Sequence, residues 1–182
     1  YNARAAIADH PRIFARWTAQ AAATRRLRAC LIDLPYGDTA HEKLDLFPAR
    51  GESAPVLVFI HGGYWRSLDK SDFSWIAPPF VSEGIAVALL NYGLAPRTPI
   101  EDMVRQVLRA LAWLHLRADR YALDPERIFV CGHSAGGHLT AMSMAALWPV
   151  LDPQLPPDLV KGGVAISGLY DLEPLLHAPF VN

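Results

Sequence analysis

Four short runs of the chain are apolar at every position. They lie at residues 56–60, 85–90, 128–131 and 164–166. A strand that faces water on one side alternates polar and apolar residues, whereas a strand covered on both faces is continuously apolar, as in parallel sheets between helices. The pattern therefore predicts a parallel sheet with helices packed on both of its faces.

Helical spacing marks the segment between the second and third apolar runs. Thr98 is predicted to cap a helix over residues 99–117, with Pro99 at the first helical position and Glu101 completing a capping box. The apolar face of this helix is expected to comprise Ile100, Met103, Val104, Val107, Leu108, Leu111 and Leu114. Alternation of helices with apolar strands favours a doubly wound α/β sheet.

The first third of the chain follows a different pattern. Residues 3–28 are rich in Ala and Arg and predict a helix that is broken near Pro11. Residues 28–34 and 43–47 predict two strands, of which the second alternates polar and apolar side chains. This alternation favours a half-exposed antiparallel hairpin at the sheet edge. The whole chain, residues 1–182, is thus expected to form one three-layer αβα domain with an antiparallel start.

Composition narrows the range of partners. The chain has 182 residues, 52% of them hydrophobic, and a net charge of −1 with scattered Lys and Arg. We expect no nucleic-acid partner, and no membrane partner, because no apolar run reaches the roughly 18 residues of a membrane span. Cys30 and Cys131 lie in apolar runs and are predicted to be free thiols, which favours a reducing, cytoplasmic location.

Residues 132–136, Gly-His-Ser-Ala-Gly, carry the clearest chemical signal. They follow the apolar run at 128–131 and precede a helix of small residues at 137–147. Strand, Gly-x-Ser-x-Gly and helix in that order build a sharp turn that presents one serine hydroxyl above the end of a sheet. Side chains at Gly132 or Gly136 would collide with neighbouring elements in so tight a turn. Ser134 is therefore predicted to be a catalytic nucleophile.

A second glycine motif offers donors for an oxyanion. His61-Gly62-Gly63-Tyr64-Trp65 directly follows the apolar run at 56–60. Backbone N–H groups of Gly62 and Gly63 could point at developing negative charge, joined by the N–H of Ala135 next to the nucleophile. Alone the motif is compatible with an ordinary turn, but together with the Ser134 turn it predicts an oxyanion hole. His61 is expected to hydrogen-bond locally rather than to transfer protons.

Three motifs together resemble a known fold. The segments 61–65, 91–96 (Asn-Tyr-Gly-Leu-Ala-Pro) and 132–138 are similar to the α/β-hydrolase fold. Within it they resemble hormone-sensitive-lipase-like esterases and, more closely, the arylformamidase (kynurenine formamidase) group, which carries His-Gly-Gly-x-Trp. The resemblance covers roughly residue 28 to the end. It implies an oxyanion hole formed by the N–H groups of Gly62 or Gly63, Tyr64 and Ala135.

The resemblance also implies a catalytic acid and a histidine downstream of the nucleophile. His138 lies one turn after Ser134 on the same helix, where its ring is not expected to reach the hydroxyl. Asp171 and His177 are six residues apart in one loop, although the fold takes its acid and base from separate loops. We therefore expect both groups, and two further strands, to lie beyond Asn182.

The predicted function is that of a serine hydrolase. It would cleave small carboxylic esters or N-aryl formamides through an acyl-enzyme on Ser134, with Trp65 lining an aromatic substrate pocket. No cofactor is expected, and no metal, since no His/Cys/Asp cluster has ligand spacing. Homodimer formation is left open. Two alternatives remain: a serine peptidase on the same scaffold, and a non-catalytic α/β-hydrolase-like binding domain.

Overall fold

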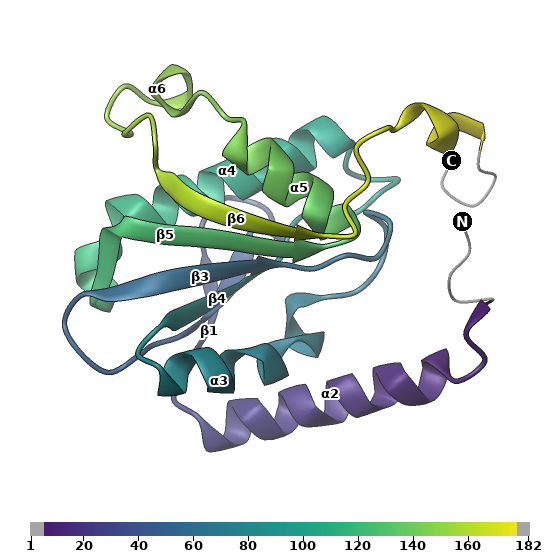
Figure 1. The fold of residues 1–182 in the computed structure, drawn as a ribbon, viewed down its shortest axis with the longest axis horizontal. Helices are drawn as coiled ribbons and strands as arrows, with labels where there is room; N and C mark the ends of the chain where they lie inside the picture. Colours follow the sequence, from purple (N-terminus) through teal and green to yellow (C-terminus); the bar gives the residue numbers. More distant parts are fainter. Residues whose placement is uncertain (1–5, 178–182) are drawn as a thin grey trace.

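A six-stranded sheet forms the centre of the computed structural model, which describes residues 6–177 (Figure 1). Its strands are β1 (Leu31–Pro35), β2 (Lys43–Phe47), β3 (Ala54–Ile60), β4 (Ala86–Leu90), β5 (Leu123–His133) and β6 (Val160–Ile166). Their order is β1-β2-β4-β3-β5-β6. β1, β2 and β4 pair antiparallel, whereas β4, β3, β5 and β6 are parallel neighbours. The predicted parallel sheet with an antiparallel start is confirmed.

Helices cover both faces of this sheet. They are α2 (His10–Leu27), α3 (Ala77–Ser82), α4 (Ile100–Leu116), α5 (Ala135–Met144) and α6 (Trp148–Leu151). α2 and α3 lie on one face and α4 and α5 on the other, which gives three layers (Figure 1). The break predicted near Pro11 is confirmed: Ala6 is helical, residues 7–9 are not, and α2 begins at His10. Pro11 lies in the first turn of α2, where proline costs no hydrogen bond.

Helix α4 buries the predicted face but begins differently from the prediction. Met103, Val107, Leu111 and Leu114 are all at most 1% exposed. The expected capping box is wrong, because Pro99 is the N-cap and no side chain caps the helix. The Thr98 hydroxyl instead packs on Gly93, where an added Cβ would lie 2.3 Å from the Thr98 Oγ1 atom. The threonine therefore serves tertiary packing rather than the helix end.

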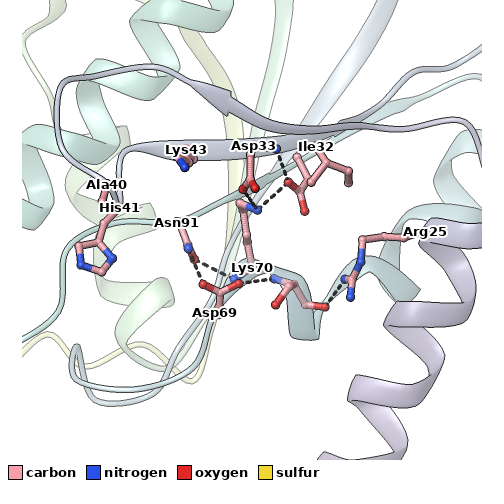
Figure 2. A pocket seen from close by; sticks show the side chains of 11 residues that line it. Arg25, Ile32, Asp33, Ala40, His41, Lys43, Asp69, Lys70 and Asn91 are labelled. Carbon is pink, nitrogen blue, oxygen red and sulfur yellow. Dashed lines mark hydrogen bonds and ion pairs between the residues drawn. The ribbon is translucent and has the colours of Figure 1, made fainter.

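Strand β2 lies inside the sheet, which corrects the prediction of a half-exposed edge. It pairs with β1 on one side and β4 on the other, and Asp45 in its middle is 0% exposed. The Asp45 carboxylate is matched by Lys70, whose Nζ lies 2.6 Å from the Asp45 Oδ1 atom. The same Nζ lies 2.8 Å from the Asp33 Oδ1 atom (Figure 2). The polar position at Asp45 therefore marks a buried ion pair rather than contact with water.

The same ion pair is part of a wider polar network. Asn91, just after β4, donates to the Asp69 Oδ2 atom at 2.6 Å and accepts from the Lys70 backbone N–H at 2.8 Å (Figure 2). The hydrogen bond from Lys70 lowers the pKa of Asp33. Stability from Asp33 is thus present at neutral pH and is lost as the pH falls through this lowered pKa. A cavity of about 350 Å³ adjoins the network.

Two predictions made from the composition concern the cysteines and the membrane. Cys30 and Cys131 are free and half-buried, and burial raises the pKa of both thiols. Within residues 6–177, no helix is both long enough and apolar enough to cross a membrane. The cytoplasmic location stays a prediction.

Replacing Lys70 with Met should destabilise the protein strongly. The methionine fills similar space but leaves the buried Asp45 charge without its partner, which costs about 3–5 kcal/mol. Lys161→Met is the matched control, because Lys161 pairs with the exposed carboxylates of Glu126 and Asp158 and should cost less than about 1 kcal/mol. Urea unfolding followed by circular dichroism measures both. Equal losses would contradict a dominant role for the Asp45 pair.

Candidate active site

Ser134 stands at the turn between β5 and α5 in an unusual backbone conformation. Its φ is 58° and its ψ is −118°, a region that costs a residue with a side chain of order 1–3 kcal/mol. The Ser134 N–H donates to the Ile166 carbonyl of β6 at 2.8 Å, so the neighbouring strand holds the turn in place. The side chain is half-exposed. The predicted sharp strand-to-helix turn is therefore present, with its serine accessible.

The two glycines of the turn are required by close backbone contacts. A Cβ atom at Gly132 would lie 2.2 Å from the Gly136 carbonyl oxygen, and one at Gly136 would lie 2.0 Å from the Ile60 carbonyl oxygen. Both distances are far below van der Waals contact with backbone atoms that cannot easily move. The first turn of α5 thus packs directly against the ends of β5 and β3, as the sequence predicts.

The loop of residues 61–65, which we call the glycine loop, lies beside this turn. β3 and β5 are adjacent, and Ile60 pairs with Gly132, so the glycine loop leaves the sheet next to the serine. A Cβ atom at Gly62 would lie 3.2 Å from the Ser134 Cβ atom. The structure therefore brings Gly62 and Ser134 together, with Ala135 opening α5 alongside. That Gly62, Gly63, Tyr64 and Ala135 donate to one oxyanion stays a prediction.

The glycine loop is tightly coiled. Gly63, Tyr64 and Trp65 have φ values of 108°, 55° and 56°, so three consecutive residues are left-handed. The Trp65 carbonyl accepts the N–H of Ala95 at 2.7 Å, which fixes the far end of the coil. Only the first of these residues is glycine, so the conformation is imposed by its surroundings rather than favoured by the local sequence.

His61 anchors the start of the glycine loop, as predicted. Its Nδ1 atom lies 2.8 Å from the Gly62 carbonyl oxygen and donates to it. Its ring is stacked on that of Tyr92 with a centroid distance of 4.6 Å, and the Tyr92 hydroxyl donates to the His61 carbonyl at 2.8 Å. Complete burial lowers the pKa of His61, so the ring is neutral and serves as a support.

Trp65 is buried, although the sequence suggests that it lines a pocket. Its side chain is 1% exposed and meets the ring of His138 at a centroid distance of 5.3 Å and an angle of 80°. Trp65 therefore supports the glycine loop from within the core, and its contact with a substrate stays a prediction.

The His138 ring is directed at Trp65 by the contact between the two rings. Burial lowers the pKa of His138, as desolvation disfavours the charged ring.

The residues after β6 also belong to this site, although no motif in the sequence points to them. Ser167 has a φ of 49°, and the Gly168 Cα atom lies 2.9 Å from the position of a Cβ added at Gly137. Residues 167–168 therefore pack against the first turn of α5. A glycine two residues after a predicted strand, at Gly168, is the one available signal. Further along, Asp171 and His177 are both exposed, and within the described part of the chain no hydrogen bond joins them.

Comparisons with known proteins agree with the fold and the motifs. The family described as BD-FAE matches residues 44–150. A kynurenine formamidase of Danio rerio is 35% identical over 160 residues, covering 87% of this chain and 52% of that protein. Esterase LipQ of Mycobacterium tuberculosis is 32% identical over 162 residues, covering 81% of this chain and 37% of that protein.

The fold is also similar to that of a solved structure. A candidate thioesterase from Silicibacter sp. TM1040 superimposes with a TM-score of 0.74 at 37% identity, covering 91% of this chain and 60% of that one. The sheet and its helices are thus those of the α/β-hydrolase fold, as predicted. The chain spans about half the length of the curated formamidase that it matches.

Proposed function

The chain belongs to the BD-FAE family, which matches residues 44–150, and on this basis we propose that it is a serine hydrolase. The observation that carries the proposal is the conformation of Ser134, which is strained at φ 58° and ψ −118° yet half-exposed beside Gly62. Backbone strain of this kind persists where the surrounding structure enforces it, and it clusters at active sites.

In the proposed reaction, the Ser134 Oγ atom forms a bond to the substrate carbonyl carbon while its proton passes to a base. The carbonyl electron pair moves to the oxygen, which the N–H groups of Gly62 or Gly63, Tyr64 and Ala135 stabilise. Collapse breaks the bond to the leaving group, which takes the proton, and leaves an ester on Ser134. Water then attacks the carbonyl carbon of this ester in the same way. The bond to the Ser134 Oγ atom breaks, which releases the carboxylic acid product and restores the serine hydroxyl. We do not assign the base or the acid to any of residues 6–177.

We propose that the substrates are small carboxylic esters or N-aryl formamides. Kynurenine formamidase from Danio rerio and esterase LipQ are both similar to this chain, which supports cleavage of a carbonyl bond next to nitrogen or oxygen. Tyr64 stands where lipase-like esterases usually have a third glycine, and its side chain is half-buried. An aromatic ring at that position restricts volume beside the carbonyl and favours a compact acyl group.

The nucleophile is tested by labelling the protein with a fluorophosphonate probe. We expect covalent labelling of the native protein and its complete loss in Ser134→Ala with unchanged circular dichroism. Ser82→Ala, which changes an exposed serine in α3, is the control and should label fully. Labelling that survives Ser134→Ala would disprove the assignment. A native protein that is folded but unreactive would favour the non-catalytic binding domain.

The glycine loop is tested by Gly62→Ala. The added methyl would lie 2.6 Å from the His133 carbonyl oxygen and 3.2 Å from the Ser134 Cβ atom, so the loop must move away from the serine. If its N–H groups hold the oxyanion, kcat should fall by about 10²–10³ with little change in KM. Gly162→Ala is the control, since its methyl would make only ordinary contact, at 3.4 Å, with Phe129. A rise in KM at constant kcat would mean that the loop binds only the ground state.

Acyl-chain length tests the compact pocket. For p-nitrophenyl esters, kcat/KM should fall by at least about tenfold from acetate to octanoate, because added methylenes find no space. N-Formylkynurenine should also be hydrolysed, with formate released. A preference for octanoate would contradict the pocket argument. Hydrolysis of esters but not of the formamide would leave the pocket intact and remove the formamidase proposal.

A further inference from the structure

A second cavity, of about 340 Å³, lies away from Ser134. It is enclosed by the end of α2, the residues that follow β2 and the first turn of α3. Phe47, in its lining, pairs with Val87 at the beginning of β4, whereas Ser134 follows the end of β5, which runs parallel to β4 through β3. The cavity therefore lies at the N-terminal ends of the parallel strands, and the candidate active site lies at their C-terminal ends.

The lining of this cavity combines apolar side chains with two arginines. Its lining includes Phe47 and Ala77, which are 1% and 0% exposed. Pro48, Pro78 and Val81, also in the lining, are half-buried. Every lining side chain is either apolar or an arginine. The cavity therefore offers apolar contact and positive charge, but no side-chain hydrogen-bond acceptor.

The charges at its rim are unbalanced. Arg28 and Arg50 are both exposed, and no carboxylate lines the cavity. Across residues 6–177, neither guanidinium takes part in an ion pair. The cavity beside Lys70 is the opposite case, because there Lys70 is paired with both Asp33 and Asp45. Arg28 also lies at the C-terminal end of α2, where a cation offsets the helix dipole, but this accounts for only one of the two charges.

We propose that this cavity binds an amphipathic monoanion, specifically an aryl carboxylate. The ring would lie on Phe47 between the prolines, and the carboxylate would be held between Arg28 and Arg50. Guanidinium groups match the planar geometry of a carboxylate and bind it through paired N–H donors. A volume of about 340 Å³ is at the lower end of small-molecule sites, which suits one or two fused rings. Leu27, which is 80% exposed at the rim, extends the apolar contact.

This site is independent of the proposed hydrolase activity, and its test needs no turnover. The probe is 2-naphthoate, titrated into the full protein and followed by calorimetry, with 2-naphthalenemethanol as the neutral analogue of the same shape. We expect saturable binding of the carboxylate at one site per chain and binding of the alcohol at least about tenfold weaker. Arg28→Gln and Arg50→Gln should each weaken naphthoate binding by about tenfold, the size of one charge-assisted hydrogen bond.

Three control proteins establish where the naphthoate binds. Arg16→Gln removes an exposed charge from α2 outside the cavity and should leave the affinity unchanged. Ala29→Trp, at the exposed rim, should block entry and abolish binding while the thermal unfolding temperature is retained. Protein whose Ser134 carries a phosphonate should bind naphthoate as before.

Several results would overturn the proposal. Equal binding of the acid and the alcohol would mean that charge plays no part. Equal weakening by Arg16→Gln would indicate a non-specific effect of net charge. Loss of binding after phosphonate labelling of Ser134 would place the ligand in the active site. Binding to anionic lipid vesicles with no binding of naphthoate would mean that Arg28 and Arg50 mark a membrane surface instead.

Discussion

The close contact between the first turn of α5 and the ends of β3 and β5 is the constraint on which the site depends. Gly136 approaches the Ile60 carbonyl so closely that even a methyl group would lie 2.0 Å from it. That approach forces the reversal at Ser134 and brings the glycine loop against the serine, because β3 continues directly into that loop. One backbone packing distance thus sets the positions of both the proposed nucleophile, Ser134, and the proposed oxyanion donors.

The polar network around Lys70 holds the segment that follows the glycine loop against strands β2 and β4. Lys70 lies five residues after Trp65 and pairs with Asp45 in β2, while Asn91 at the end of β4 binds both Asp69 and the Lys70 backbone. The segment that follows the glycine loop is therefore tied to two strands by charged and amide groups. Buried ionic groups of this kind tolerate few other partners, which favours one defined arrangement of the chain.

Sequence pattern predicts the parts of this fold that local chemistry determines. Continuous apolar runs identify the parallel strands, and Gly-x-Ser-x-Gly after such a run identifies the sharp turn at Ser134. Both signals are complete within a few residues. Asp45 is misread because its partner Lys70 lies 25 residues away, so alternation suggests an exposed face. The burial of Trp65 has no local signal for a similar reason, because it packs against His138 in another element. The cavity at Arg28 and Arg50 joins three elements and has no local signature.

The left-handed run in the glycine loop links backbone strain to substrate size. Tyr64 and Trp65 each hold a conformation that costs a residue with a side chain about 1–2 kcal/mol, and their φ values of 55° and 56° leave little room for relaxation. A glycine in place of Tyr64 would relieve this strain and, under the proposed function, would also enlarge the acyl site. Under the proposed function, the narrow acyl site is therefore the one that stores backbone strain, and widening it would release that strain.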